Sequence, residues 1–148
     1  MDLYCGYGLF TLFLAPFYAH TSGIEASRES IAAAKLNARF FPAGNRSAFH
    51  AARIERPSFA QHLPRPGCHP EVILSDPPRQ GMPGKAIAAL CRRAPVKILE
   101  ACCGIDELPG QIAAWQSCGY RMKSAAPLDM FAGTPHLETL VLFEPGRR

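Results

Sequence analysis

The chain has 148 residues, of which 48% are hydrophobic and 19% are charged, a balance that fits a folded domain and excludes a disordered chain. The net charge of +4 is compatible with an anionic partner but is too small to demand one. The apolar stretch that most resembles a signal peptide, residues 9–19, is too short to span a bilayer and has no basic residues before it. We therefore expect a soluble cytoplasmic protein with no membrane partner, built as one domain over residues 1–148.

The cysteine pattern gives no sign of a disulfide scaffold or a metal site. The six cysteines are Cys5, Cys68, Cys91, Cys102, Cys103 and Cys118, and no two have the Cys-x-x-Cys spacing. His62, Cys68 and His69 lie close in the sequence, but they lack the second ligand pair that a structural zinc site needs. We therefore predict no metal and reduced thiols.

The first elements suggest a nucleotide-like ligand. Residues 2–5 are typical of a strand end, and Gly6 and Gly8 predict a tight turn into a helix over residues 11–17. Glycines at such a turn let backbone N–H groups approach a ligand closely. A strand over residues 21–25 then ends in Glu25, and an acid about 20 residues after the first glycine binds ribose hydroxyls in dinucleotide-type βαβ units.

A capped helix and a proline-rich segment follow. Ser27 is suited to cap a helix over residues 27–41, which Pro42 and Gly44 would end. The predicted apolar face consists of Ile31, Ala34, Leu36 and Ala38. We expect a short strand around residues 48–50 and a surface loop over residues 57–70, which contain four prolines and no usable periodicity.

Residues 72–79 are the most informative stretch. Val72, Ile73 and Leu74 are apolar without alternation, as in a strand that is buried on both faces. Two prolines then end the strand and leave Asp76 and Arg79 at its carboxyl end, where open α/β sheets bind their ligands. A surface turn closed by an aspartate explains these residues equally well when they are taken alone.

The rest of the chain continues the alternation of helices and strands. We expect helices over residues 85–93 and 107–117, and strands over residues 96–102, 119–127 and 136–143. Alternating elements of this kind predict a parallel α/β sheet with right-handed crossovers. The last two strands are joined by only a short loop, residues 128–135, so we predict that they are antiparallel neighbours.

Four short motifs occur along the chain in an order that is shared with a known protein family. They are Asp-Leu-Tyr-Cys-Gly-x-Gly at residues 2–8, Asp-Pro-Pro-Arg at 76–79, Cys102-Cys103, and Asp-Met-Phe with Thr-Pro-His-Leu-Glu-Thr within 129–139. With them, nearly the whole chain resembles the methyltransferase domain of the RNA 5-methyluridine methyltransferases, a class I S-adenosylmethionine-dependent family. The resemblance implies a Rossmann-like, mostly parallel sheet with a C-terminal antiparallel strand. The arginine after the prolines favours this family, because base N-methyltransferases usually have an aromatic residue there.

The resemblance also implies a reaction and an RNA substrate, either tRNA or rRNA. Uracil C5 is a poor nucleophile, and a thiolate that adds at C6 makes C5 able to attack a methyl group. A base must afterwards remove the C5 proton so that the thiolate can leave. The family's nucleophile corresponds to Cys103 and its base to Glu138, while Arg79 would orient the nucleotide or the catalytic loop.

The cofactor implied by the resemblance is S-adenosylmethionine. Positions that contact it in the family correspond to Tyr4, Gly6, Gly8, Glu25 and Asp76. Glu25 would hold the ribose hydroxyls, and Asp76 would lie by the methionine end and the target base. On the residues alone, a small buried side chain is the favoured interpretation of Cys103. Glu138 is then either a surface position on an edge strand or a carboxylate tuned by burial, and a solvated loop explains Arg79 equally well.

The chain departs from the family pattern at several positions. The family usually has Ser-Cys-Asn-Pro around the nucleophile, where this chain has Cys102-Cys103-Gly104-Ile105. Leu9 replaces an asparagine that contacts the cofactor, and no acid follows the third strand at residues 51–53. An upstream glutamine, a complete first strand and separate RNA-binding regions are also missing. We therefore expect an N-terminally truncated or diverged member that exposes apolar surface and self-associates.

Three hypotheses follow. The first is an RNA uracil-C5 methyltransferase that works through a covalent cysteine adduct. The second is a non-catalytic remnant of the same family that binds the cofactor or RNA, which Gly104, Ile105 and Leu9 suggest. The third is a nucleic-acid N-methyltransferase, for which the Asp-Pro-Pro motif is the only support.

Overall fold

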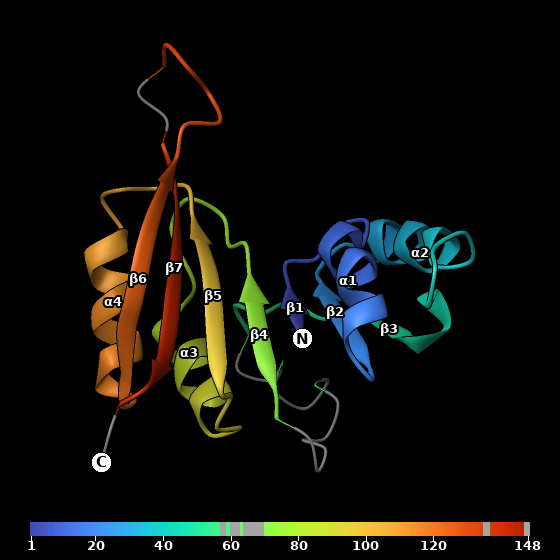
Figure 1. Ribbon diagram of the computed structural model, residues 1–148, viewed down its shortest axis with the longest axis horizontal. Helices are drawn as coiled ribbons and strands as arrows, with labels where there is room; N and C mark the ends of the chain where they lie inside the picture. The colour runs from blue at the N-terminus through green and yellow to red at the C-terminus, as the bar shows by residue number, and fades with distance from the viewer. Residues whose placement is uncertain (57–58, 60–62, 64–69, 135–136, 147–148) are drawn as a thin grey trace. The chain divides into compact units, whose positions relative to one another are not determined.

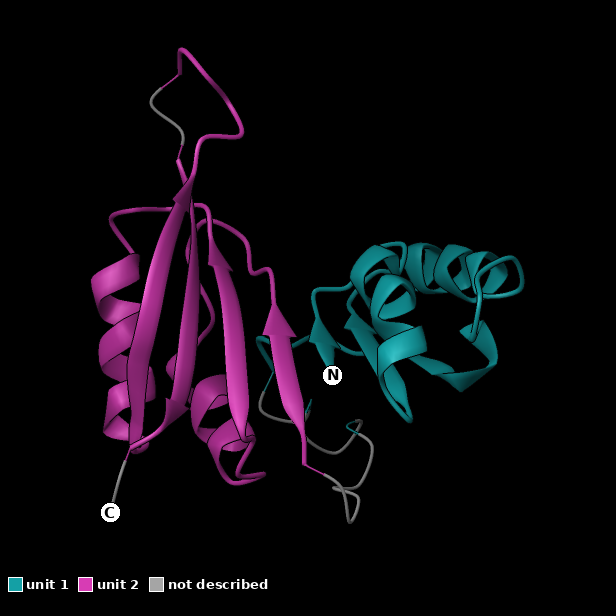
Figure 2. Cartoon of the chain, in the orientation of Figure 1, with its two compact units in different colours: residues 1–65 teal, residues 66–148 magenta. Residues whose placement is uncertain are grey.

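The computed structural model describes residues 1–56, 59, 63, 70–134 and 137–146. They fall into two units, residues 1–65 and 66–148, which Figure 2 shows in teal and magenta. The proline-rich surface loop predicted over residues 57–70 lies outside the described residues, apart from Phe59, Leu63 and Pro70. Within the described residues, no helix has the length and hydropathy that crossing a bilayer requires.

Unit 1 is a small parallel sheet with two helices. In chain order its elements are β1 (Asp2–Leu3), α1 (Leu9–Leu14), the 3-10 helix η1 (Ala15–Phe17), β2 (Thr21–Glu25), α2 (Arg28–Asn37), the 3-10 helix η2 (Gly44–Arg46) and β3 (Ser47–Ala51). The strand order is β3-β2-β1, and both pairs are parallel (Figure 1). The predicted strand over residues 21–25 is confirmed residue for residue.

Helix α2 begins as predicted but ends early. The Ser27 side chain accepts a hydrogen bond from the backbone N–H of Ser30 at 3.1 Å, which caps the helix. The helix ends at Asn37 and not at residue 41, and the chain then turns back onto the helix end at Gly44. A Cβ at Gly44 would collide with the carbonyl oxygen of Ala38, so the turn has room only for glycine. The predicted apolar face is also corrected: Ile31 and Ala34 are buried, but Leu36, which lies within the helix, is 52% exposed.

The described residues of unit 2 form four strands and two helices. They are β4 (Val72–Ser75), α3 (Gly84–Cys91), β5 (Lys97–Cys102), α4 (Leu108–Ser117), β6 (Tyr120–Leu128) and β7 (Glu138–Pro145). The strand order is β4-β5-β7-β6, with β4 and β5 parallel. Strand β7 is antiparallel to both β5 and β6, which confirms the predicted pairing of the last two strands.

The core of unit 2 is centred on Trp115 of α4, which is completely buried. Its ring lies 5.9 Å from the ring of Tyr120 in an edge-on arrangement and 5.8 Å from that of Phe143. Its indole Nε1–H donates to a carboxylate oxygen of Glu100 at 2.6 Å. Glu100 lies in β5 and is also completely buried, so this aromatic cluster contains a carboxyl group at its centre.

Helix α1 leaves several large apolar side chains in solvent. The exposed fractions are 64% for Leu9, 64% for Phe13 and 74% for Phe17, and neighbouring Tyr7 is 66% exposed. Leu9, Phe13 and Phe17 recur every four positions along α1 and η1, so they form one apolar stripe, and Tyr7 lies just before it. An exposed apolar stripe of this size favours association with another apolar surface.

We predict that the chain self-associates through this stripe. Replacing both Phe13 and Phe17 with serine should raise the dissociation constant by at least about tenfold, because each buried aromatic side chain contributes about 1.5–3 kcal/mol. Sedimentation velocity at several protein concentrations measures the change. Met130→Ser is the matched control, since Met130 is also 64% exposed but lies in unit 2. A wild-type chain that stays monomeric at every concentration would contradict the prediction.

Candidate functional site

The turn after β1 has an unusual backbone. The backbone φ angles of Tyr4, Gly6 and Gly8 are +61°, +51° and +85°, so three of the five residues 4–8 have a left-handed backbone conformation. At Gly8 a Cβ would lie 2.8 Å from the ring of Phe49, which excludes larger residues. At Gly6 nothing lies within 4 Å of the Cβ position, so a ligand can approach the backbone there.

Glu25 lies beside this turn at the end of β2. One of its carboxylate oxygens accepts from the backbone N–H of Gly6 at 3.3 Å, and the other accepts from that of Ser27 at 2.9 Å. The side chain is half-buried and held at both oxygens. The structure therefore brings together the glycine turn and the acid that the sequence had paired by spacing alone.

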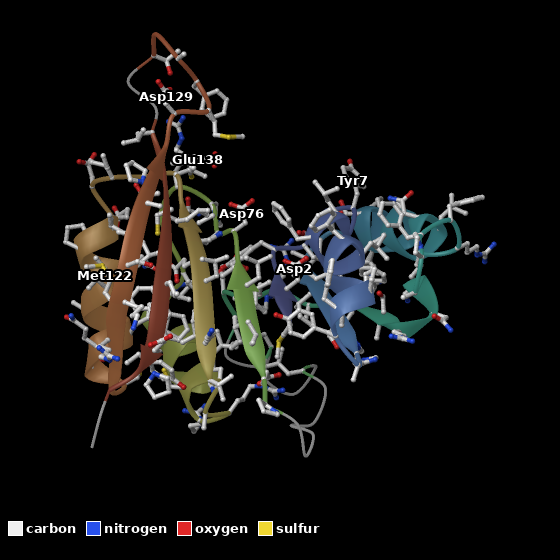
Figure 3. All side chains as sticks on the ribbon, viewed as in Figure 1. Asp2, Tyr7, Asp76, Met122, Asp129 and Glu138 are labelled. Atoms are coloured by element: carbon white, nitrogen blue, oxygen red, sulfur yellow. The ribbon has the colours of Figure 1, made fainter. Side chains whose placement is uncertain are left out.

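Asp76 follows directly after β4 in unit 2. Partial burial of its carboxyl group raises its pKa, and the negative charge of Glu138 raises it further. Asp76 follows β4 and Glu138 begins β7, and these two strands flank β5. Figure 3 labels both residues near the ends of their strands.

Arg79 and Gly104 belong to the same region. A Cβ at Gly104 would lie 2.8 Å from the carbonyl oxygen of Arg79, so the loop after β4 passes directly over the loop after β5. This contact gives a physical reason for Gly104, which stands where the resembling family has asparagine. An asparagine at this position requires the backbone around Arg79 to move.

The two adjacent cysteines have different surroundings. Cys102, the last residue of β5, is 7% exposed, and its thiol donates to a carboxylate oxygen of Glu100 at 3.6 Å. Burial, followed by the negative charge of Glu100, raises the pKa of Cys102 to about 12. Cys103 is half-buried and lies just beyond the strand. The more accessible thiol is therefore Cys103.

Cys103 and Glu138 lie at the same end of one strand pair. In the antiparallel register of β5 and β7, Cys102 pairs with Thr139. Cys103 follows Cys102 on one strand, and Glu138 precedes Thr139 on the other. Unit 2 thus brings a thiol, two carboxylates and the loop that contains Arg79 to one edge of its sheet. These groups can perform nucleophilic and proton-transfer chemistry.

The predicted residues are distributed over both units. Tyr4, Gly6, Gly8 and Glu25 belong to unit 1, and the other four belong to unit 2. In the described parts of the chain, histidine, cysteine and carboxylate side chains do not gather in groups of three or more that could hold a metal ion. The prediction of a metal-free protein stays a prediction.

Sequence reasoning missed Glu100. The only available signal was an acid within an otherwise apolar strand, at a position two residues before Cys102. Burial raises the pKa of Glu100, and the hydrogen bonds from Trp115 and Cys102 oppose this rise. Glu100 therefore supports the end of β5 from inside the core.

Comparison with known proteins gives the relatives of this chain. An RNA methyltransferase of Chlorobaculum tepidum, itself uncharacterized, is 36% identical over 143 residues, which cover 97% of this chain and 29% of the relative. The 23S rRNA (uracil(1939)-C(5))-methyltransferase RlmD of Pasteurella multocida is 38% identical over 144 residues, 97% of this chain and 32% of that protein. The chain thus spans about a third of the length of these curated relatives.

Solved structures show the same fold. The tRNA (uracil-54, C5)-methyltransferase of Pyrococcus abyssi, in complex with S-adenosyl-L-homocysteine, matches with a TM-score of 0.78 at 24% identity, over 96% of this chain and 33% of that one. The precorrin-6y C5,15-methyltransferase of Geobacter metallireducens matches with a TM-score of 0.74 at 14% identity, over 98% and 78%. These matches confirm the predicted class I methyltransferase fold.

One family model matches almost the whole chain. The model is described as tRNA (Uracil-5-)-methyltransferase and matches residues 1–145. It agrees with the resemblance that the four motifs indicate. The chain therefore belongs to the tRNA (uracil-5-)-methyltransferase family.

Proposed function

We propose that this chain carries the catalytic chemistry of an RNA methyltransferase that methylates C5 of uridine with S-adenosylmethionine as methyl donor. The observation that carries the proposal is the position of Cys103 and Glu138 at one end of the β5–β7 pair. The negative charge of Glu138 also raises the pKa of Asp76. The reaction needs a nucleophile and a base beside one pyrimidine ring, and this edge of unit 2 supplies both.

In this proposal Cys103 begins the reaction. Its thiolate forms a bond to C6 of uracil, and the electrons of the C5–C6 double bond shift toward C5 and O4. S-adenosylmethionine, when bound, supplies the electrophilic methyl group of its sulfonium centre. Glu138 then takes the proton from C5, the double bond re-forms, and the thiolate leaves C6. Arg79 and Asp76 keep the roles predicted for them, orienting the nucleotide and lying by the methionine end and the target base.

The residues of unit 1 suit the cofactor. Ribose offers two vicinal hydroxyl donors, and Glu25 presents two carboxylate oxygens that the backbone already holds in place. The open space at Gly6 leaves the backbone accessible to the same ligand. Tyr4 and Gly8 shape this turn and are proposed to contact the cofactor from it.

We predict that Glu25→Ala weakens binding of S-adenosylhomocysteine about ten- to a hundredfold. The reason is that a hydrogen bond to a charged group contributes about 1.5–3 kcal/mol. Titration calorimetry on the 148-residue chain measures the change, and circular dichroism confirms that the variant is folded. The control is Glu29→Ala, which removes an exposed acid from α2 in the same unit. Unchanged affinity in Glu25→Ala would remove this residue from the cofactor site.

Trapping with RNA that contains 5-fluorouridine tests the reaction itself. A base is unable to remove fluorine from C5 as it removes a proton, so the cysteine adduct persists after methyl transfer. We expect a covalent protein–RNA complex that forms only when S-adenosylmethionine is present. An enzyme that methylates an exocyclic nitrogen, or a non-catalytic remnant, forms no adduct, so a folded wild type without one would reject the proposal.

A further inference from the structure

A buried glutamine of α4 holds the loop that contains Arg79. Gln111 is 7% exposed, and its side chain reaches the loop over residues 76–83, which connects β4 to α3. Its amide nitrogen donates to the carbonyl oxygen of Met82 at 3.0 Å, and its amide oxygen accepts from the backbone N–H of Met82, also at 3.0 Å. One side chain thus pairs both backbone polar groups of a residue that is only 2% exposed.

The backbone before Met82 is shaped around this amide group. Gly81 has a φ of +72°, and a Cβ there would lie 2.5 Å from the amide nitrogen of Gln111. A larger residue at this position would therefore displace the glutamine. The N–H of Gly81 also donates to the carbonyl oxygen of Pro78 at 2.8 Å, which closes a turn that contains Arg79. The turn is thus tied to Gln111 through two successive residues.

The start of α4 is also tied to the loop that contains Cys103. The N–H of Gln111 donates to the carbonyl oxygen of Glu107 at 3.0 Å, and the N–H of Glu107 donates to that of Gly104 at 3.2 Å. Gly104 directly follows Cys103 and is the residue that lies against the carbonyl group of Arg79. The loops after β4 and β5 are therefore joined at two points, Gly104 and the Gln111–Met82 pair.

We propose that Gln111 is a positioning residue that fixes the turn of Arg79 relative to Cys103 during the attack on uracil. It acts through the backbone of Gly81 and Met82 and touches neither RNA nor cofactor. The inference rests on the proposed function, since the covalent attack is the step that it serves. A displacement of about 1 Å at a reacting group can slow a reaction about a hundredfold, and a doubly paired amide allows little displacement.

A purely structural role is the alternative that the test must separate. Loss of the Gln111 amide leaves two buried backbone groups of Met82 unpaired, which lowers stability wherever it occurs. Tyr120→Phe is the matched control, because the buried Tyr120 hydroxyl donates to the backbone carbonyl oxygen of Pro95 at 2.9 Å. Pro95 lies before the first residue of β5, whereas Cys103 follows the last. This variant therefore loses a comparable hydrogen bond at the far end of the same strand.

The test follows adduct formation between the full 148-residue chain and a single-stranded 5-fluorouridine RNA in the presence of S-adenosylmethionine. Gln111→Met keeps the length of the side chain and removes both hydrogen bonds. At saturating RNA we expect its rate constant for adduct formation to fall about ten- to a hundredfold. The RNA concentration that gives half the maximal rate should stay within about threefold, and Tyr120→Phe should change both quantities less than about twofold. Circular dichroism confirms that every variant is folded at the assay temperature.

Gln111→Glu provides a rescue that depends on pH. A protonated carboxyl group both donates and accepts, so it restores the two bonds to Met82, whereas a carboxylate only accepts. Burial favours the protonated form. The rate of this variant, divided by that of the wild type at the same pH, should therefore fall as the pH rises from about 5 to 8. The corresponding ratio for Gln111→Met should not change. A Gln111→Glu rate equal to that of Gln111→Met at every pH would contradict the role of the hydrogen bonds.

Amide hydrogen exchange tests the loop without the reaction. Peptides that cover residues 76–82 should exchange faster in Gln111→Met than in the wild type or in Tyr120→Phe, because the Gln111–Met82 pair is lost. Unchanged exchange would mean that Gln111 does not hold the loop, and faster exchange with a wild-type rate of adduct formation would make its role structural only. A wild type that forms no adduct rejects the proposed reaction, whereas the exchange result reports on the loop alone, so the two failures are distinguishable.

Discussion

Replacing Cys103 with alanine should abolish the covalent adduct with 5-fluorouridine RNA and lower methyl transfer by at least about a thousandfold, because the attack at C6 then has no nucleophile. Cys102→Ser should leave both intact. Cys102 is buried against Glu100, and its pKa of about 12 leaves almost no thiolate at neutral pH. Cys103 is the more accessible of the two thiols and lies at the end of the strand pair beside Glu138.

Each cysteine variant serves as the experimental control for the other. Adjacent residues at the end of a strand point to opposite sides, so only one of the two thiols can face the substrate. Denaturing electrophoresis measures the adduct, and mass spectrometry of the trapped peptide identifies the modified residue. Loss of the adduct in Cys102→Ser together with a normal adduct in Cys103→Ala would reverse the assignment and contradict the orientation proposed for the end of β5.

Local patterns in the sequence predicted much of the fold. The strand that ends in Glu25 was predicted with its observed limits, and the short connection before β7 correctly predicted an antiparallel pair. The spacing of Gly6 and Glu25 predicted a dinucleotide-type ligand unit, and in the structure a hydrogen bond joins the two residues. Each of these features depends on a few neighbouring residues or on the general rules of α/β topology.

The features that were missed depend on residues far apart in the chain. Helix α2 ends at Asn37, several residues before the Pro42 and Gly44 that the sequence offers as its stop, and the chain then packs back onto Ala38 at Gly44. The contact of Gly104 with the carbonyl oxygen of Arg79 joins two loops 25 positions apart, so the sequence presented Gly104 only as a departure from a motif. The pocket lined by Arg28, Arg53 and Arg56 likewise requires the ends of β2 and β3 to meet.

The aromatic core around Glu100 should be the most sensitive part of unit 2. Trp115→Ala should lower the free energy of unfolding by about 3–5 kcal/mol, because it leaves a large cavity beside Tyr120 and Phe143. Trp115→Phe keeps most of the packing and removes the N–H donor to Glu100, so its cost should be about 1–3 kcal/mol. Urea denaturation followed by circular dichroism measures both changes.

The pH dependence separates the hydrogen bond from the packing. Burial raises the pKa of Glu100 above its ordinary value of 4.5, so the stability that this group contributes is complete below pH 4.5 and is lost as the pH rises through the folded-state value. The Trp115 N–H favours the charged form and opposes this loss. The cost of Trp115→Phe should therefore increase as the pH rises through the folded-state pKa of Glu100, which lies above 4.5. In a Glu100→Gln background the cost should be independent of pH, since no charge develops at that position. A cost that rises equally in both backgrounds would mean that another ionisable group, and not the Glu100 carboxylate, responds to the indole.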